Sequence, residues 1–112
     1  MIYPKKLENL IECYKKLPTI GEKSAERLAL ATLEMSTEDV ENFANSLVIA
    51  KNELLKCKVC GNLSDTEVCP ICADENRNKN IICVIEDPKS IFTFEKVGNF
   101  IGTYHVLNGL IS

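Results

Sequence analysis

The chain has 112 residues, of which 46% are hydrophobic and 26% charged, and its formal net charge is −3. This composition is typical of a globular protein, and the length suits one domain or a few small modules. The sequence contains no apolar run near the roughly 18 residues that a membrane helix needs, so we expect no membrane span. Because the N-terminus lacks the apolar stretch of a secretory signal, we expect a cytoplasmic protein.

Charge is distributed unevenly along the chain. The first 33 residues carry six Lys or Arg against four Glu, whereas residues 34–50 carry four acidic residues and no basic one. Basic side chains that neutralise phosphates supply most non-specific affinity for nucleic acid. If the chain binds nucleic acid, the first third is therefore the expected contact surface.

Three helices are predicted in the first half of the chain. Residues 5–17 and 22–35 place apolar side chains at helical spacing, and Pro18 and Gly21 separate the two segments. Ser36 is the expected N-cap of a third helix. The buried side of this third helix is predicted to consist of six apolar residues: Val40, Phe43, Ala44, Leu47, Leu54 and Leu55.

The second half predicts a strand, a helix and a strand. Residues 81–85 form a short apolar run, which is typical of a central strand covered on both faces. A helix that ends near Gly98 and a strand in "GTYHVL" follow, and this order begins an α/β unit. Since two strands do not form an independently stable sheet, we expect this chain to be part of something longer or to complete its sheet with a partner. The predicted fold class is α+β with several modules.

Four cysteines form the pattern C-x2-C-x8-C-x2-C: Cys57, Cys60, Cys69 and Cys72. Thiols stay reduced in the cytoplasm, so this pattern favours a metal site over disulfides. Two C-x-x-C pairs present four thiolates in the tetrahedral arrangement that Zn²⁺ prefers, although such a site also accepts iron. Because four protein sulfurs leave no open position for a substrate, the zinc is predicted to be structural.

A thioredoxin-like redox motif is the alternative for the cysteines. That motif is a single C-x-x-C beside a βαβ pattern, whereas here two pairs lie close together before any predicted strand. The spacing therefore favours zinc. Cys83, within the apolar run, and His105, the single histidine, are expected to lie outside the metal set.

The segment "LPTIGEKSAERLA", residues 17–29, predicts a short turn between the first two helices. A helix N-terminus attracts phosphate through its free N–H groups and its dipole, and Gly21 leaves room for a close approach. With basic side chains four residues apart, the segment resembles the helix-hairpin-helix, a motif that binds the DNA backbone. Thr19 stands where that motif has its first glycine. The residues expected to contact DNA are Ile20, Gly21, Lys23 and Arg27.

Taken together, the hairpin, the segment "CKVCGNLSDTEVCPIC" and the strings "ICVIEDP" and "YHVLNG" resemble the bacterial recombination mediator family RecR over almost the whole chain. The resemblance implies a helix-hairpin-helix domain at 1–55, a four-cysteine zinc finger at 56–73 and the beginning of a Toprim domain at 80–112. It also implies that the chain is an N-terminal fragment of a longer protein.

The family resemblance further implies a non-catalytic protein of DNA repair and recombination. Such a protein binds gapped or single-stranded DNA, forms ring-like homo-oligomers and acts with RecO and RecF to load RecA. Glu86, at the end of the first strand, is a possible contact residue for RecO by the same resemblance.

Two other functions stay open at this stage. The first is a Toprim-type phosphoryl-transfer enzyme. Catalytic Toprim domains use a glutamate at the position of Glu86 and a later Asp-x-Asp pair that holds Mg²⁺, on which phosphoryl transfer depends. This chain has no Asp-x-Asp. A protein-only adaptor is the other alternative, and the net charge of −3 favours it.

Overall fold

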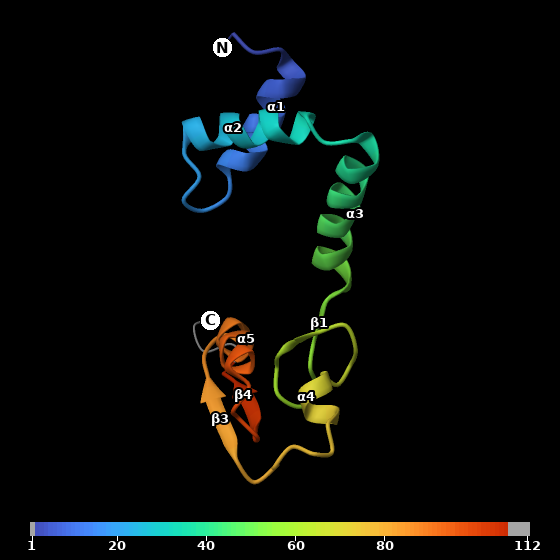
Figure 1. Ribbon diagram of the computed structural model, residues 1–112, viewed down its shortest axis with the longest axis vertical. Coiled ribbons are helices and arrows are strands. Elements are labelled where there is room, and N and C mark those ends of the chain that lie inside the picture. Colours follow the sequence, from blue (N-terminus) through green and yellow to red (C-terminus); the bar gives the residue numbers. More distant parts are fainter. Residues whose placement is uncertain (1, 108–112) are drawn as a thin grey trace. The chain divides into compact units, whose positions relative to one another are not determined.

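The computed structural model describes residues 2–107 and divides into two compact units, Met1–Val48 and Ile49–Ser112. We call them the N-terminal and the C-terminal unit, and Figure 1 shows their elements. In the described part of the chain, no helix has the length and apolarity required to cross a membrane.

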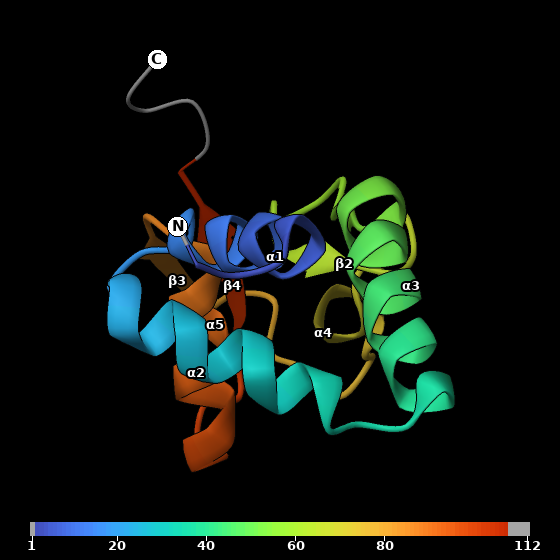
Figure 2. The same ribbon diagram turned by 90° about the horizontal axis from the view of Figure 1, so that it is seen from above.

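Two helices, α1 (Lys5–Lys15) and α2 (Glu22–Leu33), pack against each other in the N-terminal unit (Figure 2). Ile11 of α1 and Ala25 and Ala29 of α2 are completely buried between them. The small alanine side chains let the two backbones approach closely. Both helices were predicted, and each ends two residues before the predicted limit of 17 or 35.

The turn between α1 and α2 has one residue in the left-handed region. Thr19 has a φ of 65°, although a β-branched side chain disfavours this conformation. The Ile20 amide donates to the Leu17 carbonyl, and Gly21 is the N-cap residue whose carbonyl accepts from the Ala25 amide at 2.9 Å. Residue 19 therefore adopts the backbone that glycine favours at this turn, despite its side chain.

The third helix, α3 (Thr37–Glu53), begins as predicted, because the Asp39 amide donates to the Ser36 hydroxyl at 3.1 Å. The prediction of a buried side was wrong. No residue of α3 is buried; Phe43 is 44% exposed and Leu47 is 60% exposed. An apolar stripe is buried only where another element covers it, and the buried faces of α1 and α2 are turned toward each other.

The C-terminal unit contains two small sheets. The strands β1 (Leu55–Lys56) and β2 (Leu63–Ser64) are antiparallel, and the short helix α4 (Pro70–Ala73) follows them; the sequence did not predict these three elements. The predicted strand, helix and strand are confirmed as β3 (Ile82–Ile85), α5 (Pro88–Val97) and β4 (Thr103–Val106). The strands β3 and β4 run parallel, and Gly98, with a φ of 81°, ends α5.

One face of the β3–β4 sheet is covered and the other is open. Ile85, Ile91, Tyr104 and Val106 form a core between the strands and α5. On β3, however, Ile82 and Val84 are each 59% exposed, so the prediction that both faces are covered was wrong. Side chains alternate along a strand, and α5 packs on one face only. The overall α+β class is confirmed, whereas the predicted limits at 55, 73 and 80 stay predictions.

Arg77 ties the polar loop before β3 to α5 and β4. Its guanidinium donates to the carboxylate of Glu95 and to the carbonyls of Phe100 and Gly102, both at 3.2 Å. The hydrogen bond from Arg77 holds the pKa of Glu95 below its usual range, and the Tyr104 hydroxyl donates to the same carboxylate at 2.6 Å. The loop, helix and strand are therefore joined through one carboxylate.

Replacing Thr19 by glycine should stabilise the N-terminal unit. The left-handed conformation costs an L-residue roughly 1–2 kcal/mol, while glycine's extra freedom in the unfolded chain costs about 0.5–1 kcal/mol. We therefore expect Thr19→Gly to raise the free energy of unfolding by about 0.5–1 kcal/mol, measured by denaturant titration of helical circular dichroism. Thr19→Ala keeps a Cβ and is the control; an equal gain for both variants would contradict this account.

Candidate metal centre

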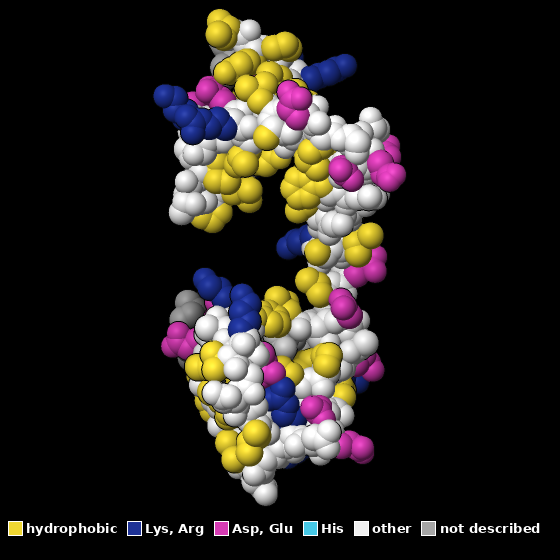
Figure 3. Space-filling view, viewed as in Figure 1, with side chains coloured by type: hydrophobic (Ala, Val, Ile, Leu, Met, Phe, Trp, Pro, Cys, Tyr) yellow, Lys and Arg dark blue, Asp and Glu magenta, His cyan; other side chains and the backbone are white. Residues whose placement is uncertain are grey.

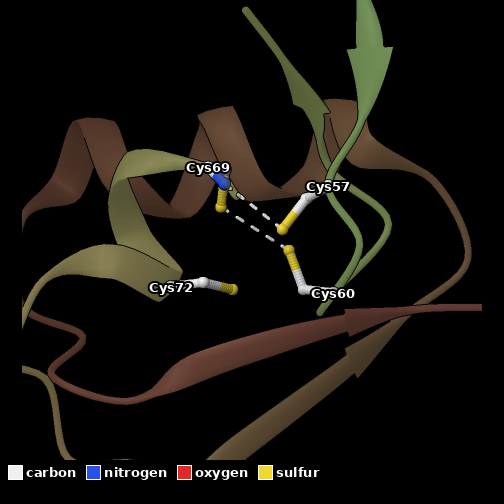
Figure 4. A group of neighbouring side chains, drawn as sticks. All are labelled: Cys57, Cys60, Cys69 and Cys72. Carbon is white, nitrogen blue, oxygen red and sulfur yellow. Dashed lines mark hydrogen bonds between the residues drawn. The ribbon is translucent and has the colours of Figure 1, made fainter. Parts of the chain in front are cut away.

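The four cysteine side chains converge from two segments of the C-terminal unit. Cys57 and Cys60 lie in the connection between β1 and β2, whereas Cys69 is the N-cap residue of α4 and Cys72 lies within that helix. All four are buried, with 0–7% exposure. Their sulfur atoms lie within 4.8 Å of one another and point toward a common centre (Figure 4).

Backbone amides orient the sulfur atoms. The Sγ of Cys57 accepts from the amides of Val59 at 3.4 Å and Cys69 at 3.3 Å, and the Sγ of Cys60 accepts from the Asn62 amide at 3.4 Å. Gly61, with a φ of 86°, supplies the left-handed turn that this knuckle requires. Such outer hydrogen bonds fix the ligands of a metal site and stabilise the thiolate form.

The thiols differ in acidity because burial and hydrogen bonding act in opposite directions. Burial raises the pKa of Cys60 to about 11 and also raises the pKa of Cys72. Burial acts the same way on Cys57, but hydrogen bonds from the amides of Cys69, Cys60 and Val59 outweigh it and lower its pKa to about 6. A cation at the centre must therefore displace protons from at least Cys60 and Cys72 at neutral pH.

The spacing of the sulfur atoms fits a tetrahedral zinc ion. Four Zn–S bonds of about 2.3 Å place neighbouring sulfurs about 3.8 Å apart, and the Sγ atoms of Cys60 and Cys69 are 3.7 Å apart. A disulfide would require about 2.05 Å, and all the cysteines are free. Cys83, in β3, and His105, in β4, do not belong to the group, as predicted.

Comparison with known proteins identifies two segments of the chain. A family model for the helix-hairpin-helix of RecR matches residues 7–51, and one for the four-cysteine zinc finger domain of RecR matches residues 56–74. Recombination protein RecR of Clostridium perfringens is 54% identical over 98% of this chain. The chain belongs to the RecR family.

Other RecR proteins are similar to this chain over its whole length. Those of Streptococcus equi subsp. equi and Lactobacillus helveticus are 53% and 45% identical over the whole chain. The chain spans 56–57% of the length of these three relatives. Since the cysteines lie within the RecR zinc-finger match, the metal is zinc, and its four sulfur ligands make the site structural.

The residues predicted to contact DNA lie together around the start of α2. Gly21, Lys23 and Arg27 are exposed, and Ile20 is half-buried against the α1–α2 core. Within residues 2–107, neither Lys23 nor Arg27 has an acidic partner. Glu86, the predicted partner contact, is exposed directly after β3, within the C-terminal unit.

Three supporting contacts of the zinc site were not predicted. The Cys60 carbonyl accepts from the Val106 amide of β4 at 2.7 Å, and the Cys72 carbonyl accepts from the Lys79 ammonium group at 2.6 Å. Ile71, between two cysteines, also packs against both the cysteine cluster and the sheet core. The contacts of Val106 and Ile71 join the zinc site to the β3–β4 sheet and its core, and that of Lys79 joins it to the loop before β3. The contacts of Val106 and Lys79 use backbone carbonyls of the cysteines, which leave no pattern in a sequence.

Replacing one ligand should remove the zinc. We expect Cys60→Ser to abolish stoichiometric zinc binding, because a neutral hydroxyl is a poor substitute for a buried thiolate. Cys83→Ser removes a thiol outside the cluster and should retain one zinc ion per chain. Elemental analysis of the purified variants measures the ratio of zinc to protein. Full zinc content in Cys60→Ser, or loss of zinc in Cys83→Ser, would contradict the assignment of the site.

Proposed function

We propose that this chain is the DNA-binding part of a recombination mediator of DNA repair. The observation that carries the proposal is the match to RecR proteins along the whole chain, with the helix-hairpin-helix match over residues 7–51. The relatives are named recombination proteins. The proposed ligand is gapped or single-stranded DNA, held through its backbone.

The geometry of the hairpin supports a phosphate contact. The N-terminus of α2 has no side-chain cap, so its first N–H groups are available to a phosphate oxygen. No atom lies within 4 Å of the position that a Cβ on Gly21 would occupy, which leaves this side of the turn open. Lys23 and Arg27 follow on the exposed part of α2, where their charges add to the field of the helix dipole.

Such contacts hold DNA without reading its sequence. Phosphate contacts fix position and affinity but carry no base information, which suits a protein that acts wherever DNA is gapped. One chain supplies few charges, and its net charge is −3. We therefore propose that several copies in a homo-oligomer act together, since linked weak contacts raise the effective concentration at each site.

The partners are proposed from the family resemblance. The chain would act with RecO and RecF to load RecA, and exposed Glu86 would contact RecO. We also assign residues 80–112 to the beginning of a Toprim domain, supported by the parallel strands β3 and β4 joined through α5; of these residues, 108–112 lie outside the described part.

Two alternatives remain as outcomes of experiment. A Toprim-type phosphoryl-transfer enzyme would use Glu86, but because the sequence has no Asp-x-Asp to hold Mg²⁺, we propose a non-catalytic role. A Mg²⁺-dependent nicking or primer-synthesis assay separates these two functions. A protein-only adaptor would bind no DNA at all.

Reversing the charge of Lys23 should weaken DNA binding. Fluorescence anisotropy with a gapped duplex at low and moderate salt compares the parent chain with Lys23→Glu. We expect roughly tenfold weaker binding at low salt, similar for unrelated DNA sequences, and a shallower salt dependence because one phosphate contact is lost.

The matched control is Lys89→Glu, which makes the same change of charge at an exposed position in the first turn of α5. It should bind within about twofold of the parent, because an acidic residue is tolerated at a helix N-terminus. Equal binding by the parent and Lys23→Glu would show that the hairpin is not the contact. Absence of binding by the parent at low salt would mean either that the homo-oligomer is required for binding or that the chain is a protein-only adaptor.

A further inference from the structure

An ion-pair network crosses the hairpin from α1 to α2. The ammonium group of Lys15, in the last turn of α1, lies 2.8 Å from the carboxylate of Glu22 and 3.3 Å from that of Glu12. The hydrogen bond with Glu22, followed by that with Glu12, raises the pKa of Lys15. Lys15 is therefore charged at neutral pH, and its charge is already paired.

The position of Glu22 matters for any anion that approaches the hairpin. Glu22 is the first residue of α2, between Gly21 and Lys23, and its side chain is 51% exposed. A carboxylate near a helix N-terminus is stabilised by the same N–H groups and dipole that would attract a phosphate. It also repels a second negative charge nearby, because two unit charges a few ångströms apart interact strongly even at a protein surface.

The other basic side chains near the turn are not restrained in this way. Lys16, Lys23 and Arg27 are exposed, and in the described chain none of them pairs with an acidic group. Figure 3 shows Lys and Arg side chains gathered over the first turns of α2, with acidic side chains next to them. The surface thus combines four basic side chains, of which Lys15 is paired, with three acidic ones, Glu12, Glu22 and Glu26. Of the three carboxylates, that of Glu22 belongs to the first residue of α2.

We propose that Glu22 limits the affinity of the hairpin for the phosphodiester backbone, and that Lys15 exchanges Glu22 for a phosphate when DNA binds. The inference rests on the proposed function. It adds one residue that weakens DNA binding, whereas the residues named so far strengthen it. Removal of the Glu22 charge has two consequences. It ends the repulsion of the phosphate, and it leaves Lys15 available as an additional contact.

The test compares two neutralising substitutions, Glu22→Gln and Glu12→Gln, in the zinc-loaded chain. The two carboxylates are matched, since both pair with Lys15 and their side chains are 51% and 53% exposed. Only Glu22 belongs to α2. The amide signals of residues 21–24 are followed by NMR as a short DNA duplex is added at low salt, a method that measures weak affinities as well as strong ones.

Glu22→Gln should bind DNA about threefold to tenfold more tightly than the parent, with a difference that shrinks as salt screens the charges. Glu12→Gln should stay within about twofold, because Glu22 still holds Lys15 and still repels the phosphate. Adding Lys15→Met to Glu22→Gln should remove part of the gain, which identifies Lys15 as the released contact. Thermal unfolding verifies that each variant is folded.

The outcomes separate this inference from the proposed function. If the parent binds and Lys23→Glu weakens binding, but Glu22→Gln and Glu12→Gln bind equally well, the hairpin contacts DNA and Glu22 does not limit it. If the amides of residues 21–24 in the folded parent do not respond to DNA at any concentration, the hairpin is not a DNA contact, and both the proposed function and this inference are wrong.

Discussion

The C-terminal unit depends on the bonds between four thiolates and one zinc ion. Its two sheets are too small to be stable alone, since a two-stranded sheet buries little apolar surface. The cysteine cluster and the sheet core meet through Ile71, and β4 donates a hydrogen bond to the Cys60 carbonyl. In such a small module, metal affinity becomes folding free energy, because the unfolded chain has no site. The zinc therefore supports the whole unit, β3 and β4 included.

The N-terminal unit uses a different means of stabilisation. Here two helices are held by close packing of Ile11 against Ala25 and Ala29, with an ion pair and a strained turn at the end where they join. The same turn presents to solvent Gly21 and the start of α2, which has no side-chain cap. The residues that close the hairpin thus also shape its proposed phosphate contact. Glu22 has a role in each: it pairs with Lys15 across the hairpin, and it limits access by anions.

The sequence predicted those features that depend on spacing along the chain. The C-x2-C pairs predicted the four sulfurs that the structure brings together, Pro18 marked the region where α1 ends, and Gly98 marked the end of α5. Features that depend on partners distant in sequence could not be predicted. The exposed side of α3 and the open face of β3 both carry apolar patterns, but no described element covers them. The backbone amides that donate to the cysteine sulfurs leave no pattern in the sequence. The left-handed conformation of Thr19 had one indication in the sequence, since this residue stands where the helix-hairpin-helix motif has a glycine.

Removal of zinc, monitored by NMR on the whole chain, tests the account most directly. A chelator is added to the reduced protein, and the backbone amide signals of the two units are compared before and after. The account predicts that signals from β3, α5 and β4 collapse together with those around the cysteines, while the signals of α1 and α2 keep their positions. If the signals of β3 and β4 persist unchanged after the zinc has left, the metal does not hold the C-terminal unit together.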